Sequence, residues 1–254
     1  MVWIALMSTF MIAMAGAAVG SGVASISRRH LGLLVYLATG ALLAVTAFDI
    51  FPESSTVLSW PGVVVAGLCG FALLGAINRY VFEVCPSCGI AHMDHHRLRH
   101  DRRAFALLAV ALGAHCFLDG MAVAAGAGVS KGSGLGLTLG VLLHKLPEGF
   151  ALALLLVNAG RGAWSALWRC GAIQSATLVG GVLGMCLLGQ STPKAFMGAT
   201  FAFVGGGFLF LVANAARGIK ASGPERNLRM AVGAQLASFA ITGMFLCWIC
   251  GRLL

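Results

Sequence analysis

Two apolar segments of this 254-residue chain each carry a histidine and a carboxylate four residues apart. The first segment contains His115 and Asp119, and the second contains His144 and Glu148. On an α-helix, residues four apart lie one above the other on the same face. Each segment therefore offers one nitrogen and one oxygen that point the same way, a donor set typical of divalent metal sites.

Three ionisable side chains, those of Asp119, Lys145 and Glu148, lie within these apolar segments. Each charge costs roughly 2.5–3.5 kcal/mol at the centre of a membrane helix, so three unpaired charges would cost about 8–10 kcal/mol. A divalent cation held between the two helices, with Lys145 as a further partner, is the simplest compensation. Imidazole and carboxylate suit Zn²⁺ and also Fe²⁺, Mn²⁺ or Cd²⁺. The alternative is a structural network of ion pairs that locks the two helices together.

The composition places the chain among integral membrane proteins. Apolar residues make up 59% of it and charged residues 10%, whereas a soluble domain carries about 25% charged residues. We expect a single transmembrane domain over residues 1–254, with eight apolar runs that are each close to the ~20 residues needed to cross a bilayer. These runs span roughly 3–25, 31–50, 60–82, 104–128, 134–157, 168–190, 196–216 and 229–251.

Lysine and arginine are distributed unevenly between the loops. Of the 17 such residues, 13 fall in or beside the first, third, fifth and seventh loops, 3 fall on the other side, and Lys145 lies within a run. Because loops rich in Lys and Arg stay in the cytoplasm, both termini are predicted to lie outside. The formal net charge of +9 is then explained by membrane anchoring, and no nucleic-acid partner is expected.

Two residues inside the segments extend the predicted site. Cys116 adjoins His115 and is either a further thiolate ligand or a small buried packing residue. Pro147 removes a backbone hydrogen bond and frees a carbonyl one turn earlier in its helix. A freed carbonyl beside a metal ligand can line a polar path, although an ordinary membrane-helix kink is the alternative.

Two further groups carry metal-binding side chains. Asp49 and Glu53 lie near the outer end of the second run and form either an acidic entrance for cations or an ordinary solvated helix end. The predicted cytoplasmic loop 83–103 has a Cys-x-x-Cys followed by histidines, which favours a zinc site over a disulfide in a reducing compartment, with loose metal binding as the alternative. Its candidate ligands are Cys85, Cys88, His92, His95, His96 and His100.

These motifs resemble those of the ZIP (ZRT/IRT-like) family of divalent metal transporters. The fourth run reads His115-Cys-Phe-Leu-Asp119-Gly, similar to the family pattern His-Asn-x-x-Asp-Gly, and the fifth reads His144-Lys-Leu-Pro-Glu148-Gly, similar to its Pro-Glu-Gly variant. The resemblance implies an all-α bundle of eight transmembrane helices in a 3+2+3 arrangement with an inverted repeat. It also maps His115, His144 and Glu148 onto the family's primary metal site, midway through the membrane.

The chain departs from the family pattern where a second metal would bind. Cys116 replaces the usual Asn, Lys145 replaces the acid that usually follows the second histidine, and the sixth run carries no glutamate. We therefore expect a site for one metal ion, in which the Lys145 ammonium takes the place of a second cation.

The favoured interpretation is a transporter, not an enzyme, that moves a divalent metal, zinc first, toward the cytoplasm across a bacterial inner (plasma) membrane. The predicted partners are the metal ion, the lipid bilayer and a second copy of the chain in a homodimer. The alternatives are an intramembrane zinc-dependent hydrolase, for which Asp119 is the only spare acid, and a metal-gated channel or sensor that uses the same site.

Overall fold

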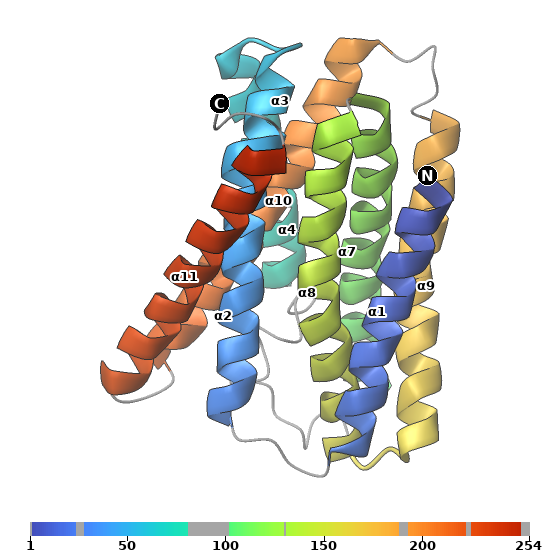
Figure 1. Ribbon diagram of the computed structural model, residues 1–254. Helices are drawn as coiled ribbons and strands as arrows, with labels where there is room; N and C mark the ends of the chain where they lie inside the picture. Colours follow the sequence, from blue (N-terminus) through green and yellow to red (C-terminus); the bar gives the residue numbers. More distant parts are fainter. Residues whose placement is uncertain are drawn as a thin grey trace.

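The chain forms a bundle of long helices in the computed structural model (Figure 1). The structure describes residues 2–23, 28–80, 102–129, 131–187, 193–221 and 225–249. Within these ranges every regular element is a helix, which confirms the predicted all-α class.

Among the described helices, seven are long and apolar enough to cross a bilayer, and they overlap the first seven predicted runs. A further helix at the end of the chain has an apolar stretch, Val232–Trp248, of 17 residues, slightly below the ~20 that a crossing needs. The long helices are α1 (Val2–Gly22), α2 (Arg28–Val45), α4 (Trp60–Tyr80), α7 (Arg102–Val129), α8 (Lys131–Asn158), α9 (Ala163–Leu187), α10 (Lys194–Ala221) and α11 (Glu225–Ile249).

The second span is irregular at its C-terminal end. α2 continues through a π-helical turn, η1 (Thr46–Ile50), into the short helix α3 (Phe51–Ser55). The helical span therefore continues to Ser55, beyond the predicted end at about residue 50. π-helical turns are rare and frequently occur at functional sites.

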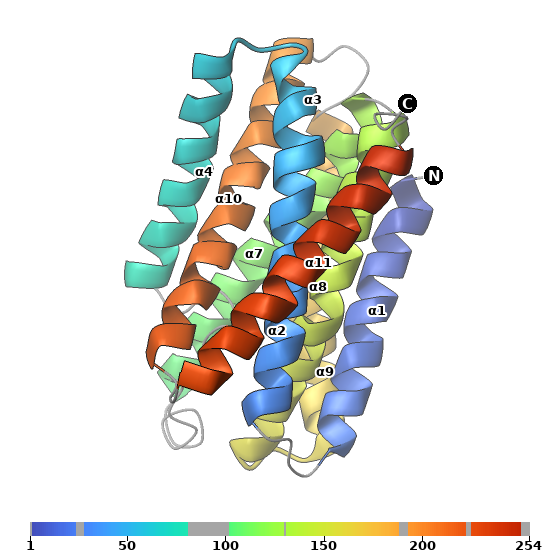
Figure 2. The ribbon, with the colours of Figure 1, turned by 60° about the vertical axis from the view of Figure 1, so that its left-hand side comes forward.

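The central helices α7 and α8 lie side by side, and the other helices surround them in pairs (Figures 1 and 2). α1 packs along α8, and α9 packs along α7. In the same way α10 packs along α4, and α11 packs along α2. α2 also contacts α8, and α10 contacts α7, so the two central helices connect the outer pairs.

Glycines let the central helices approach their outer partners closely. A Cβ at Gly149 of α8 would overlap the carbonyl oxygen of Ala13 in α1, and a Cβ at Gly120 of α7 would overlap that of Thr177 in α9. Small residues of this kind permit close backbone packing in membranes. Each of these glycines directly follows the carboxylate residue of its helix, so the packing fixes the backbone next to the predicted ligands.

The outer faces of the bundle are apolar and the polar side chains lie inside. Met11 of α1, Leu68 of α4, Trp168 of α9 and Leu236 of α11 are each at least 60% exposed. A protein with such a surface would aggregate in water, whereas lipid solvates apolar side chains. The protein is therefore an integral membrane protein whose charged interior must serve a purpose other than solubility.

Candidate metal centre

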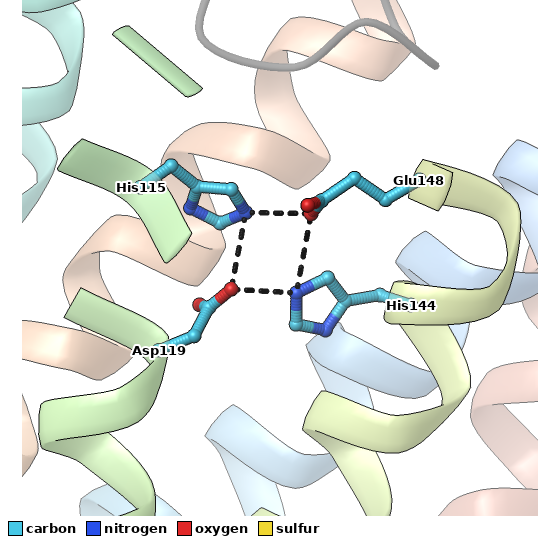
Figure 3. Close-up of side chains that lie close together, drawn as sticks. All are labelled: His115, Asp119, His144 and Glu148. Atoms are coloured by element: carbon cyan, nitrogen blue, oxygen red, sulfur yellow. Dashed lines mark hydrogen bonds and ion pairs between the residues drawn. The ribbon is translucent and has the colours of Figure 1, made fainter. Parts of the chain in front are cut away.

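The structure brings the four predicted ligand residues of α7 and α8 into one cluster (Figure 3). His115 and Asp119 project from α7, and His144 and Glu148 project from α8, toward one point between the helices. One ligand atom of each residue lies within 4.8 Å of those of the other three. The most exposed of them, His144, has only 5% of its surface accessible, so the cluster is enclosed by protein.

Nitrogen and oxygen alternate around the cluster. His115 Nε2 lies 3.1 Å from Glu148 Oε2 and 3.5 Å from Asp119 Oδ2. His144 Nε2 lies 3.3 Å from Asp119 Oδ2 and 3.9 Å from Glu148 Oε2. A tetrahedral zinc ion with bonds of about 2.0–2.2 Å sets its ligand atoms about 3.3–3.6 Å apart. The observed separations bracket this range, so the four atoms can enclose one such ion with small side-chain adjustments.

A backbone hydrogen bond orients the His144 ring. Its Nδ1 donates to the carbonyl oxygen of Gly140, one turn earlier in α8, at 3.1 Å. This leaves Nε2, which faces Asp119, as the nitrogen available to a metal. Histidine ligands commonly have a second hydrogen bond that fixes the tautomer in this way. Phe208 of α10 packs edge-on against the same ring, with the ring centroids 5.7 Å apart.

Lys145 lies on the side of the cluster that faces α9. Its side chain is completely buried, and Nζ lies 2.8 Å from Asp119 Oδ2 and 2.9 Å from Glu148 Oε1. Nζ also donates to Cys116 Sγ at 3.1 Å. A buried charge persists only with charged and hydrogen-bonding partners, and these contacts supply them. The ammonium offsets one of the two buried carboxylate charges and leaves the other for a metal.

The thiol of Cys116 belongs to the lysine side of the cluster. Its Sγ lies 3.3 Å from Glu148 Oε1 and 3.4 Å from Gln174 Oε1, so its one S–H can donate to either oxygen. The four ligand atoms that converge between α7 and α8 do not include it. The structure therefore places Cys116 beside Glu148 Oε1, the oxygen that is not part of the four-atom cluster, where its thiol acts as a hydrogen-bond partner.

Gln174 of α9 completes the cluster, although the sequence reasoning missed it. Its side chain is completely buried, and Nε2 donates to Glu148 Oε1 at 2.7 Å. Its Oε1 accepts from Lys145 Nζ at 3.2 Å. The sequence did contain a signal for it, an amide side chain in a largely apolar run. Buried amides in membrane helices usually form a hydrogen bond with a neighbouring helix.

Asp49, Glu53 and Pro147 are not among the four residues whose ligand atoms converge. Asp49 is completely buried in η1, while Glu53 in α3 is partly exposed, so their role as a cation entrance stays a prediction. Pro147 lies inside α8, which continues as a helix through it. The predicted loop zinc site lies outside the described residues and also stays a prediction; it comprises Cys85, Cys88, His92, His95, His96 and His100.

A small cavity reaches the cluster from the side of α4 and α10. His115 and Asp119 form part of its wall, so the ligands of α7 are not sealed on this side. The full lining is Gly70, Leu74, His115, Leu118, Asp119, Phe203, Val204, Gly207 and Phe208.

Comparison with known proteins agrees with this geometry. The protein named zinc transporter ZIP13 of Rattus norvegicus is 36% identical over 99 residues, which cover 37% of this chain and 26% of the relative. ZIP13 of Homo sapiens is 36% identical over 107 residues, which cover 37% of this chain and 28% of the relative. The match thus spans little more than a quarter of the length of these relatives.

A family model gives broader coverage. The model described as ZIP zinc transporter matches residues 87–214, just over half of the chain. This stretch contains α7, α8 and α9, and therefore every residue of the cluster described above. The chain belongs to the ZIP zinc transporter family.

Proposed function

We propose that this protein carries divalent metal cations, zinc first among them, across the membrane toward the cytoplasm through the site between α7 and α8. The observation that carries the proposal is the enclosed cluster of His115, Asp119, His144 and Glu148 within two membrane-length helices. Two imidazoles and two carboxylates can replace the water shell of Zn²⁺, and they also suit Fe²⁺, Mn²⁺ or Cd²⁺. The names of the ZIP13 relatives support zinc as the first candidate.

Transport requires that the ion leave as well as enter, and the site has a feature that favours release. Asp119 Oδ2 is a neighbour both of the histidine nitrogens and of Lys145 Nζ. A bound metal and the ammonium therefore compete for this oxygen. Such competition keeps the affinity moderate, whereas a closed Cys₄ site would hold zinc as a structural ion.

We also propose that Lys145 replaces a second metal ion. Its Nζ contacts side-chain oxygen atoms of Asp119, Glu148 and Gln174 and the sulfur atom of Cys116. Such atoms could otherwise ligate a metal cation. The ammonium supplies a fixed positive charge at this position. One mobile ion per site follows from this arrangement.

A 3+2+3 arrangement with an inverted repeat is supported by matching contacts on the two sides of the bundle. A Cβ at Gly16 of α1 would overlap the carbonyl of Leu146, two residues after His144. A Cβ at Gly180 of α9 would overlap the carbonyl of Phe117, two residues after His115. α1 thus packs on α8 as α9 packs on α7, and the two outer helices run in opposite directions (Figure 1).

The proposed orientation, with both termini outside, is supported by where the basic helix ends lie. α2 begins at Arg28, α4 has Arg79 in its last turn, and α7 begins at Arg102. Arg161 lies in the connection between α8 and α9. In Figure 1, α2 begins and α8 connects to α9 at the lower end of the bundle, and α4 runs toward this end while α7 runs away from it; we assign this end to the cytoplasm.

Family membership bears on the alternative of an intramembrane zinc-dependent hydrolase. The ZIP family consists of transporters and not of enzymes, which sets aside the intramembrane hydrolase. Asp119, the one spare acid that a hydrolase would have used, is a member of the four-ligand group. Location in a bacterial inner membrane and assembly as a homodimer stay predictions.

The test is metal uptake into proteoliposomes that contain the purified protein, with Zn²⁺, Fe²⁺, Mn²⁺ and Cd²⁺ supplied separately. We expect zinc uptake by the wild type and an initial rate at least about tenfold lower for His144→Ala, as expected when a metal ligand is lost. Leu143→Ala is the matched control, because Leu143 adjoins His144 on α8 but is 49% exposed. Folded wild type that moves no divalent metal, or His144→Ala that transports as well as Leu143→Ala, would overturn the proposal.

A further inference from the structure

Gln174 touches three members of the cluster from a third helix. Its Nε2 lies 2.7 Å from Glu148 Oε1, and its Oε1 lies 3.2 Å from Lys145 Nζ and 3.4 Å from Cys116 Sγ. Its side chain is completely buried in α9. A fully buried amide whose two ends both have partners holds those partners in a fixed relation.

The chemistry of the partners fixes which way the amide points. Lys145 can only donate hydrogen bonds, so it must face the carbonyl oxygen of the amide. The ionised Glu148 can only accept them, so it must face the NH₂ group. A carboxylate at position 174 could accept from Lys145 but could not donate to Glu148.

One oxygen of Glu148 is fully engaged as a result. Oε1 accepts from Gln174 Nε2 at 2.7 Å and from Lys145 Nζ at 2.9 Å, and Cys116 Sγ lies 3.3 Å away. The other oxygen, Oε2, faces His115 Nε2 at 3.1 Å. The two nitrogen donors occupy both lone pairs of Oε1, whereas Oε2 points into the group of four ligand atoms. Loss of the Gln174 donor would therefore free one lone pair of Oε1 for a metal.

The position of Gln174 is fixed by the backbone of α9 and not by its side chain alone. α9 packs against α7 through Gly120 and Gly180, where a Cβ on either side would overlap a carbonyl oxygen of the facing helix. The amide therefore cannot withdraw from the cluster without separation of these two helices.

We propose that Gln174 is a positioning residue that makes Glu148 a one-oxygen ligand and thereby sets the metal selectivity of the site; the inference rests on the proposed function. With Oε1 occupied, the protein offers four donor atoms, one each from His115, Asp119, His144 and Glu148. Four donors suit tetrahedral Zn²⁺, whereas Mn²⁺ prefers six ligands rich in oxygen. Release of Oε1 would allow Glu148 to bind through both oxygens, which raises the coordination number and favours Mn²⁺.

The experiment compares Gln174→Met with wild type as purified full-length protein in detergent. Zn²⁺ and Mn²⁺ affinities are measured by competition titration, and X-ray absorption at the zinc edge reports the number of oxygen and nitrogen neighbours. We expect the ratio of zinc to manganese affinity to fall at least about tenfold, with one additional oxygen near zinc. A residue that only packs the helices would lower both affinities together and leave their ratio unchanged.

Thr177→Val is the matched control. Thr177 lies one turn further along α9, is equally buried, and its hydroxyl has no hydrogen-bond partner among the described residues. Its replacement by an apolar side chain of similar shape should leave the ratio within about twofold of wild type. If Gln174→Met does not fold, Gln174→Leu takes its place, because leucine also removes both hydrogen bonds and adds no charge or metal ligand.

The outcomes separate this inference from the proposed function. Wild type that binds zinc through His144, together with Gln174 variants whose metal ratio and zinc coordination are unchanged, overturns the role of Gln174 and leaves the transport site standing. Wild type that binds neither ion overturns both. A lowered ratio in the Gln174 variants but not in Thr177→Val establishes the positioning role.

Discussion

The two central helices present the same chemistry at the same spacing, yet their surroundings differ. His115 and Asp119 of α7 correspond to His144 and Glu148 of α8, each 29 positions later in the chain. A glycine follows each carboxylate and packs against the backbone of an outer helix, α9 for α7 and α1 for α8. The backbone frame of the site is therefore the same on both sides.

The difference lies in the residue after each histidine. In α7 it is Cys116, a neutral thiol, and in α8 it is Lys145, a buried cation. Both side chains point to the same region next to Gln174 of α9. The matching positions thus form the proposed metal site, and the unmatched positions determine the charge beside it.

The close backbone packing at Gly120 and Gly149 is shared by the two central helices, and its loss should have the largest effect on the protein. Gly120→Ala and Gly149→Ala should each destabilise the protein by about 1–3 kcal/mol or prevent folding, because the new Cβ would overlap a backbone carbonyl. Thermal unfolding in detergent and monodispersity on size exclusion measure the effect. Gly113→Ala of α7 is the control, since a Cβ there meets nothing within 4 Å. Equal melting temperatures for the three variants would show that the close packing is not required.

Removal of a proposed histidine ligand should have the second-largest effect. Because α7 and α8 present their histidines in the same way, the two losses of zinc affinity should be similar. His115→Ala and His144→Ala should each lower zinc affinity by at least about tenfold, and to similar extents, because each removes one of two nitrogen donors. Isothermal titration calorimetry of the folded variants gives the comparison. A large loss for one histidine and none for the other would mean that the two helices do not share the ion.

The third change concerns Lys145, the cation that stands in α8 where α7 has Cys116. Lys145→Glu should create a second metal position beside Asp119, because it replaces a fixed cation with a carboxylate among atoms that already include Glu148 Oε1 and Cys116 Sγ. The expected stoichiometry is two zinc ions per chain in place of one, counted by elemental analysis after removal of free metal. A variant that still retains one ion would show that Lys145 does not stand in for a cation.

A smaller effect is expected at the matching position in α7. Cys116→Ala should change zinc affinity by less than about threefold, since Sγ faces Lys145 and Gln174 and not the four ligand atoms. Competition titration with a chromophoric chelator resolves a change of this size. A loss comparable to that of a histidine variant would restore Cys116 as a metal ligand.

The smallest effect should come from the loop between α4 and α7. Deletion of residues 85–100 should leave initial zinc uptake into proteoliposomes largely intact and lower the total metal bound, because the loop is predicted to bind zinc away from the membrane site. Loss of uptake in a folded, membrane-inserted deletion would place the loop on the transport path.

Much of the cluster follows from the sequence because it depends on local geometry. A helix places residues i and i+4 on one face whatever surrounds it, so the two histidine and carboxylate pairs are visible in the spacing alone. The apolar runs predict in a similar way the seven described helices that are long and apolar enough to cross a bilayer, whereas an eighth crossing stays a prediction. What the spacing does not determine is how two helices rotate against each other and which third helix covers them.

The residues that were missed or misplaced depend on such tertiary packing. Gln174 reaches Glu148 only because α9 approaches α7 closely at Gly120, a contact between segments far apart in the chain. Cys116 faces Lys145 because α7 and α8 lie side by side. The second span continues through the π-helical turn Thr46–Ile50 to Ser55, and a simple hydrophobic period does not predict such a turn.

The central claim is that one metal ion binds between α7 and α8. Anomalous diffraction at the zinc edge from crystals of the protein grown with zinc tests it most directly. We expect a single strong peak within about 2.3 Å of His115 Nε2, His144 Nε2 and Glu148 Oε2, with Lys145 Nζ beside Glu148 Oε1. A zinc peak elsewhere in the membrane region, with these side chains unliganded, would contradict the account.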